Sequence, residues 1–198
     1  MTDTDQTQIQ IEEAQAASNQ YQLTSLLGDL GCLPFVALTA LIVDAWVNGQ
    51  GLQSASLFGL YAPYVFIAYS AVILSFLSGA LWERSRLSDQ ARPPAAAILF
   101  SNLVALSAWV SLLLIYLMPL MTLFAVVLLM AGFLSLLWVE RLSFARISHG
   151  SPNKQSTPNK QITQSSYWSM RLRITALVVI MHAVVLALMV QTLMIQGV

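Results

Sequence analysis

The feature that most limits the fold is a series of five apolar stretches, each close to the length that crosses a lipid bilayer. They cover about residues 26–47, 57–82, 95–118, 120–139 and 173–195. A hydrocarbon core about 30 Å thick takes roughly 20 apolar residues in a helix, and the stretch 57–82 has no charged side chain. The sequence therefore predicts an all-α fold, an integral membrane bundle of five transmembrane helices forming one membrane domain, residues 26–195.

The scarcity of charge excludes several classes of protein. Of 198 residues, 57% are hydrophobic and only 9% are charged, with nine acidic and nine basic side chains. A soluble domain carries about 25% charged residues, a disordered chain needs more charge than this, and a nucleic-acid binder needs a basic excess. The expected surrounding is therefore the lipid bilayer, and no nucleic-acid partner is expected.

The polar segments predict the ends and loops of this bundle. Residues 1–25 are rich in Gln and Thr and predict a mobile N-terminal tail, in which residues 9–27 could form a short surface helix. They carry acidic but no basic residues, unlike a cleavable signal peptide. Pro119 leaves a very short connection between the third and fourth spans, which predicts an antiparallel hairpin. Residues 140–170 predict a long flexible cytoplasmic loop.

The basic residues predict the orientation of the bundle. All nine lie after the second span or between the fourth and fifth spans: Arg84, Arg86, Arg92, Arg141, Arg146, Lys154, Lys160, Arg171 and Arg173. By the positive-inside rule, the N terminus is cytoplasmic and the C terminus lies on the opposite face, most simply in a bacterial inner (plasma) membrane. Four side chains near the basic loops are expected to anchor helices at the headgroups: Trp82, Trp168, Arg171 and Arg173.

Three polar side chains lie within or at the edges of the apolar spans and are candidate sites. They are Asn102, His182 and Asp44. Burying such a group is costly unless it is paired, so each marks a site by default. For His182 we favour a structural hydrogen bond over a proton-linked role or a metal ligand, and for Asn102 an interhelical hydrogen bond, for which His182 is one candidate partner. Asp44 is interpreted as an interface charge.

A stripe of small residues predicts close helix packing in the second span. Ala71, Ser75 and Gly79 recur every four residues, a spacing that places them on one helix face. We interpret this face as internal packing of the bundle. The alternative is a contact between copies of the chain.

No group of residues predicts catalysis or cofactor binding. Cys32 is the only cysteine, the two histidines are far apart, and no phosphate loop, His-Glu-x-x-His motif or serine elbow occurs. We therefore expect no catalytic residue, no metal and no cofactor, and not an enzyme.

Three segments carry a resemblance to a known family. Residues 27–35 read LGDLGCLPF, residues 68–82 read AYSAVILSFLSGALW, and the last span begins with Tyr167-x-x-Met170-Arg171-x-x-Ile174-Thr175. Together these segments resemble a family of small integral membrane proteins of unknown function that includes the mitochondrial transmembrane protein 69. The chain departs from that pattern at Ser78, where the family has glycine, and at Glu83, where glycine follows the tryptophan. The resemblance implies an inner-membrane protein but no activity that could be assigned to particular residues.

These observations favour a non-enzymatic structural or accessory component of the membrane, which packs against a membrane-protein partner or forms a homo-oligomer. The alternative is a small permease or proton-linked channel, in which His182, Asn102 and Asp44 line a polar path. A third interpretation, an enzyme acting on lipid, would need Glu83, Glu140 and His149 to meet at the cytoplasmic face.

Overall fold

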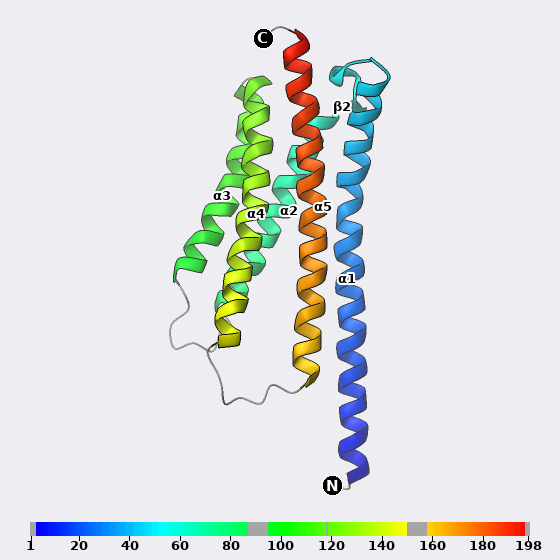
Figure 1. Ribbon diagram of the computed structural model, residues 1–198, viewed down its shortest axis with the longest axis vertical. Helices are drawn as coiled ribbons and strands as arrows, with labels where there is room; N and C mark the ends of the chain where they lie inside the picture. Colours follow the sequence, from blue (N-terminus) through cyan, green and yellow to red (C-terminus); the bar gives the residue numbers. More distant parts are fainter. Residues whose placement is uncertain (1–2, 87–94, 118, 150–157, 197–198) are drawn as a thin grey trace.

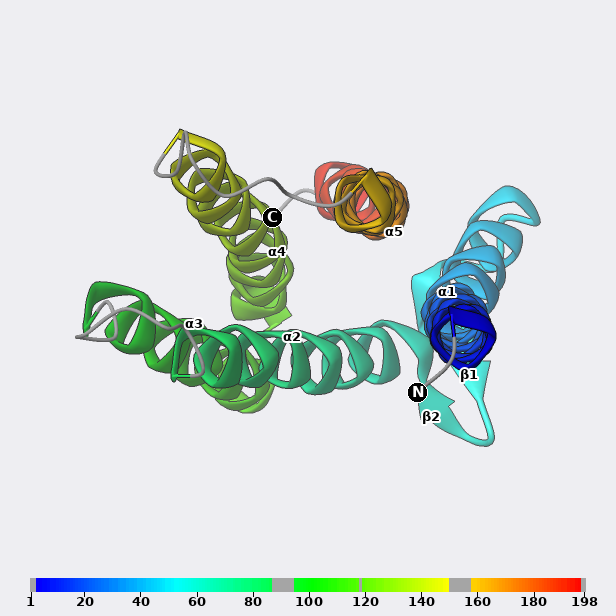
Figure 2. The same cartoon turned by 90° about the horizontal axis from the view of Figure 1, so that it is seen from below.

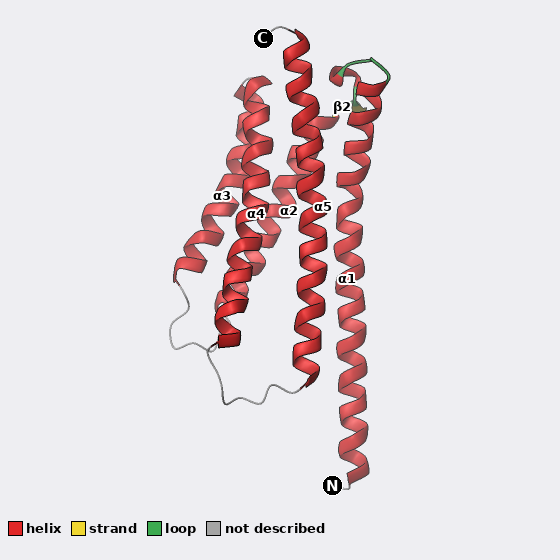
Figure 3. Cartoon of the chain, in the orientation of Figure 1, coloured by secondary structure: helices red, strands yellow, loops and turns green. Residues whose placement is uncertain are grey.

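The residues that the structure describes form a bundle of five long helices (Figures 1 and 3). The structure, a computed structural model, describes residues 3–86, 95–117, 119–149 and 158–196. The helices are α1 (Asp3–Val47), α2 (Ala62–Arg86), α3 (Ala95–Leu117), α4 (Pro119–His149) and α5 (Pro158–Gln196). Five segments, one from each helix, are long and apolar enough to cross a membrane: Ser25–Val47, Ala62–Ser85, Ala95–Leu117, Leu120–Leu142 and Trp168–Ile195. The predicted five-helix membrane fold is therefore confirmed.

The helices alternate in direction. The start of α1 and the end of α5 therefore lie at opposite ends of the bundle (Figure 1). The helix α2 packs against α1, α3 and α4, and α5 packs against α1 and α4 (Figure 2). The helices α3 and α4 lie antiparallel and in extensive contact, which agrees with the predicted hairpin. The peripheral helix α3 packs chiefly on α2 and α4. The helices α1, α2, α4 and α5 therefore surround the centre of the bundle.

The connection between α1 and α2 differs from the prediction. A short 3-10 turn, η1 (Leu52–Ser54), leads into a hairpin of β1 (Ser56–Leu57) and β2 (Leu60–Tyr61). Its two loop residues, Phe58 and Gly59, have φ of 52° and 80°, the positive values that a two-residue hairpin of this kind requires. The second span therefore begins at Ala62 and not at residue 57.

Two helices extend beyond the predicted spans. The segment expected to be an N-terminal tail is helical from Asp3, and this part of α1 extends past the ends of the other helices (Figure 1). The predicted loop 140–170 is helical up to His149 and again from Pro158, and only residues 150–157 lie outside the described chain. Polar, helix-forming sequence thus continues both helices beyond their apolar segments.

The core lies where α1, α2, α4 and α5 meet. Its largest fully buried apolar side chains include Phe35, Phe66, Leu74 and Leu129. Two helices lie close together at Gly132 of α4, where an added Cβ would lie 2.5 Å from a methyl carbon of Leu74 in α2. Close packing of this kind holds helices together in lipid, where no hydrophobic effect drives them together.

Candidate functional site, an interhelical pocket with a charged end

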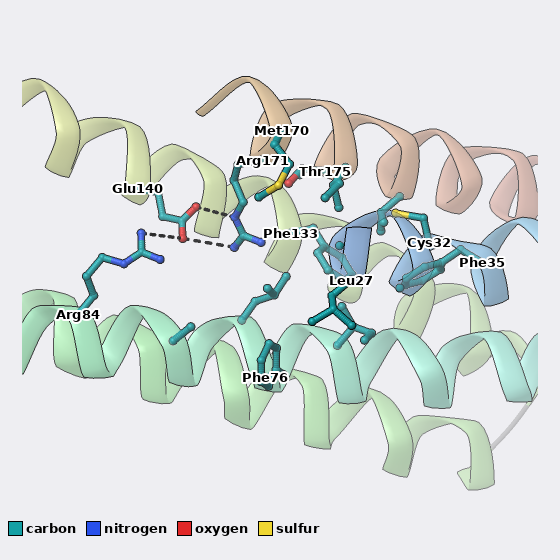
Figure 4. A pocket seen from close by; sticks show the side chains of 17 residues that line it. Leu27, Cys32, Phe35, Phe76, Arg84, Phe133, Glu140, Met170, Arg171 and Thr175 are labelled. Carbon is teal, nitrogen blue, oxygen red and sulfur yellow. Dashed lines mark hydrogen bonds and ion pairs between the residues drawn. The ribbon is translucent and has the colours of Figure 1, made fainter. Parts of the chain in front are cut away.

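A pocket of about 400 Å³ lies between α1, α2, α4 and α5 (Figure 4). This volume is within the usual range for sites that bind small molecules. Its walls are almost entirely apolar, and charged side chains line one end. The pocket is lined by Leu27, Gly28, Gly31, Cys32, Phe35, Ile73, Phe76, Leu77, Ala80, Arg84, Phe133, Glu140, Met170, Arg171, Ile174, Thr175 and Val178.

A buried ion pair forms the charged end of the pocket. Arg171 Nε donates to Glu140 Oε2 at 2.9 Å, and Arg171 Nη2 donates to Oε1 at 3.3 Å. The side chains of Arg171 and Glu140 are only 9% and 2% exposed. Glu140 follows the last apolar turns of α4, and Arg171 precedes the apolar part of α5, so the antiparallel packing of α4 on α5 places them at one level. The sequence predicted Arg171 as a headgroup anchor; in the structure it is buried in this pair.

A second arginine approaches the same carboxylate from α2. Arg84 Nη1 lies 3.9 Å from Glu140 Oε1, and the Arg84 side chain is 47% exposed. Two guanidinium groups therefore face one carboxylate.

A separate ion pair joins α1 to α5. Arg173 Nη2 donates to both oxygens of Asp29, at 2.7 and 2.9 Å. Both side chains are at least half exposed and neither lines the pocket. Arg173 lies near the start of the apolar segment of α5, where the sequence predicted an anchor at the lipid headgroups. The exposed pair contributes about 0–1 kcal/mol to stability.

His182 is enclosed in the core of the bundle. Its ring is fully buried, and Nδ1 lies 2.8 Å from the carbonyl oxygen of Val178. Because a carbonyl oxygen can only accept a hydrogen bond, Nδ1 carries the proton and donates it. Three phenylalanine rings surround it, those of Phe35, Phe66 and Phe133, with ring centroids 5.9, 4.8 and 5.5 Å away. Within the described part of the chain, His182 Nε2 has no hydrogen-bond partner.

Asn102 and Asp44 are exposed, whereas His182 is buried in the core of the bundle. Asn102 is exposed on α3, where its side-chain amide donates to the carbonyl of Ile98 at 3.1 Å. Asp44 is exposed near the end of α1 and accepts a hydrogen bond from Asn48 at 3.1 Å. The structure therefore does not bring the three candidate polar residues together, and the suggested bond between Asn102 and His182 is absent from the described contacts.

The three small residues of the predicted stripe in α2 do not all pack against one neighbouring helix. Ala71 is buried, Ser75 is half-buried, and Gly79 is exposed with open space where a Cβ would lie. Close approaches occur instead at Gly132, against Leu74, and at Gly28, where an added Cβ would lie 2.7 Å from Ile174 Cδ1. Both glycines lie outside the predicted stripe.

The remaining candidates are described only in part. Trp82 and Trp168 are half-buried near the ends of their spans. Glu83 is exposed, Glu140 is engaged by Arg171, and the side chain of His149 lies outside what the structure describes. Over the described residues, no three His, Cys, Asp or Glu side chains are placed to hold a metal ion.

Sequence reasoning missed the pocket and the role of Arg84. One signal was present: Arg84, Glu140 and Arg171 each stand within three residues of the end of an apolar span, on the same predicted side of the membrane. Charges at one level are expected to pair when their helices touch. The sequence does not show which helices touch.

Comparison with known proteins identifies a family but no activity. Residues 21–187 match a family described as a protein of unknown function, DUF3429. No curated protein and no solved structure shows significant similarity to the chain. Because the match spans most of the chain and covers the pocket with its charged end, the chain belongs to this family of proteins of unknown function.

Proposed function

We propose that this protein is a non-enzymatic accessory component of the membrane that holds an amphiphile from the bilayer in its interhelical pocket. The observation that carries the proposal is an apolar pocket with a charged end at the centre of a bundle whose solvent is lipid. An empty apolar cavity costs stability because the side chains around it lack packing partners, and such cavities take up apolar molecules. A lipid chain is the apolar molecule most available inside a membrane.

The mouth of the pocket supports entry from the bilayer. Leu27 of α1 and Phe76 of α2 both line the pocket, and they are 59% and 71% exposed. Side chains that line the pocket and are also exposed are expected at its opening, which we place between α1 and α2; Figure 4 shows both side chains among those that line the pocket. A lipid chain could enter sideways through this opening without crossing water.

We further propose that the charged end faces the cytoplasm, with the N terminus cytoplasmic and the C terminus on the opposite side of a bacterial inner membrane. The positive-inside distribution of all nine basic residues supports this orientation. The resemblance to the family that includes the mitochondrial transmembrane protein 69 supports an inner membrane. A phosphatase reporter fused after Val198 should be active and one fused after Lys160 inactive; the reverse pattern would overturn the orientation.

The pocket proposal is tested by native mass spectrometry of the detergent-purified protein. Gly31 lines the pocket and Gly79 faces outward, and neither has an atom within 4 Å of an added Cβ. Gly31→Phe should fill part of the pocket and abolish retention of a bound amphiphile, whereas the matched variant Gly79→Phe should retain it. A wild-type protein that carries no amphiphile, or equal retention by both variants, would contradict the proposal.

The exposed amide of Asn102 favours a partner helix that packs against α3. Asn102 exposes a polar amide within the apolar span of α3, and its one described bond is to its own helix. In lipid, an exposed amide gains from a hydrogen bond to another helix. We therefore propose that this face of α3 contacts a second membrane helix, from another protein or from a second copy of the chain.

Cysteine cross-linking in native membranes tests the helix contact. Cys32 is buried, so Cys32→Ser gives a background without cysteine, into which Asn102→Cys is introduced. Val72→Cys, exposed on α2, is the control. A cross-linked product specific to position 102 supports the contact, and its mass tells a second copy from another protein. Equal products at both positions, or none, would contradict it.

The permease alternative remains a proposal with less support. A polar path would need His182, Asn102 and Asp44 to line one passage, yet they lie in the core, on the outer face of α3 and at the end of α1. A flux in proteoliposomes that His182→Ala abolishes while leaving the fold intact would restore this alternative.

A further inference from the structure

The hairpin between α1 and α2 presents an apolar tip to the surroundings. Phe58 is 95% exposed and Leu60 is 63% exposed. We propose that this hairpin is a membrane anchor, which inserts Phe58 and Leu60 into the lipid interface on that side of the membrane, where headgroups meet acyl chains. The inference concerns the lipid surface at this end of the bundle and does not depend on the amphiphile pocket.

The base of the hairpin is fixed to the bundle. Leu52, Ala55 and Ala62 are buried, and Ala62 N donates to the Ala55 carbonyl oxygen at 2.9 Å. Leu57, in the first strand, packs against the buried core. The exposed tip is therefore held in one place by a buried base, and its direction is set by the fold.

The backbone at the tip is unfavourable for the side chain that it carries. Phe58 has φ of 52°, in the left-handed region that a bulky L residue rarely adopts. Two-residue turns of this kind favour Asn-Gly, so an asparagine would form the same turn with less strain. Because the Phe58 side chain is almost fully exposed, packing within the described chain does not offset this strain. A lipid interface does, because a phenyl ring gains free energy when it leaves water.

The hairpin points sideways from the bundle. Figure 1 shows it at the end of α1, and Figure 2, which looks along the bundle, shows β1 and β2 extending outward from α1 and α2, away from α3, α4 and α5. The membrane-spanning segments on either side of it end at Val47 and begin at Ala62. The tip therefore lies beside the bundle, at the level where two spans end, and lipid is what surrounds the bundle there.

Charge is nearly absent from this end of the chain's spans, so apolar side chains must anchor it. Residues 45–82, 93–139 and 174–198 contain no Asp, Glu, Lys or Arg, which leaves Asp44 as the single charged side chain that the sequence offers here. Basic residues that bind headgroups lie at the other end, as Arg173 does. Aromatic and aliphatic side chains are the remaining means of holding a protein at a membrane interface.

The experiment measures the depth of the tip by electron paramagnetic resonance of a nitroxide label, in phosphatidylglycerol–phosphatidylcholine nanodiscs that hold one copy of the protein. Cys32→Ser removes the native cysteine, and Phe58→Cys or Gln53→Cys carries the label. Gln53 is exposed in the same connection but precedes the hairpin. We expect the ratio of collisions with dissolved oxygen to collisions with a water-soluble nickel chelate to be roughly threefold higher at position 58 than at position 53, because oxygen concentrates in lipid.

Two further variants test whether Phe58 itself holds the hairpin in the membrane. The label is placed at Leu60→Cys, and Phe58 is either kept or changed in Phe58→Asn or Phe58→Trp. Asparagine suits the turn but not the lipid interface, so Phe58→Asn should raise collisions of the label with the nickel chelate about threefold. Phe58→Trp keeps an aromatic ring at the tip and should leave these collisions unchanged.

Three results would overturn the anchor. Equal collision ratios at positions 58 and 53 would place the tip in water. Few collisions with either reagent at position 58 would mean that protein, and not lipid, covers the tip. Equal nickel collisions in Phe58→Asn and Phe58→Trp would show that the ring does not hold the hairpin in the membrane. Because asparagine favours this turn, loss of the hairpin is not expected in Phe58→Asn, and none of these results bears on the amphiphile pocket.

Discussion

The two ends of the bundle are built in different ways. At the end where α2 and α4 finish and the apolar part of α5 begins, charged side chains join different helices: Arg171 and Arg84 at Glu140, and Arg173 at Asp29. At the other end, around residues 44–61, the described contacts are local, as in the bond from Asn48 to Asp44 and the two-residue hairpin turn. At one end, ion pairs connect different helices, whereas at the other end a local turn connects two consecutive helices.

This difference suggests a division of roles. A local turn needs only the correct φ values and a few backbone bonds, such as the one from Ala62 N to the Ala55 carbonyl at 2.9 Å. A buried ion pair costs desolvation energy that its attraction only partly offsets, so it is weak evidence for stability alone. We therefore propose that the charged end belongs to the amphiphile site and that the other end closes the fold.

The largest expected effect is at the buried pair. Arg171→Ala leaves Glu140 buried without its main partner and should destabilise the fold by about 3–5 kcal/mol. Asp44→Ala at the opposite end, an exposed position, should change stability by no more than about 0.5 kcal/mol. Reversible unfolding in mixed micelles measures both.

A double variant separates charge from packing at the same place. Arg171→Met combined with Glu140→Leu removes both charges and should recover most of the stability that Arg171→Ala loses. Equal stability losses for Arg171→Ala and Asp44→Ala would show that the two ends do not differ in the way described.

A smaller effect is expected at the hairpin. Gly59 has φ of 80°, and placing an L side chain there costs about 1–2 kcal/mol. Gly59→Ala should therefore lower the free energy of unfolding by this amount without changing lipid binding. Gly31→Ala, in the regular helix α1, is the control and should not destabilise the fold. A change in lipid affinity for Gly59→Ala would argue against the separation of the two ends.

The smallest effect is expected for the exposed pair of Asp29 and Arg173. A double-mutant cycle should give a coupling of about 0.2–1 kcal/mol, and high salt should reduce it because both side chains are at least half exposed. A coupling of several kcal/mol would place this pair in the same class as Glu140 and Arg171.

The sequence predicted the spans well but not which helix faces meet. Apolar length is a local property, so five membrane-crossing segments follow from the chain itself. The pairing of Glu140 with Arg171 depends on α4 lying beside α5, which no local pattern specifies. The same reason explains why the suggested bond between Asn102 and His182 is absent from the described contacts.

Helix ends were harder to predict than spans. The tail and the loop after Val139 were predicted from polarity, yet polar sequence can continue a helix outside the membrane, as it does in α1 from Asp3 and in α5 from Pro158. The start of α2 was misplaced for a different reason. Residues 57–61 are apolar enough for a span, but the positive φ values at Phe58 and Gly59 belong to a turn.

The central claim, our proposal that the pocket holds an amphiphile from the bilayer, is tested most directly by mapping where a photoreactive lipid attaches. A phosphatidylglycerol with a diazirine along its chain is incorporated with the protein into nanodiscs, and the adducts are located by peptide mass spectrometry. We predict that adducts concentrate on pocket residues such as Leu77, Phe133 and Ile174, and that the pocket-filling variant Gly31→Phe removes them. Adducts spread evenly over outward-facing side chains such as Leu99, Leu103 and Trp109, with none in the pocket, would contradict the claim.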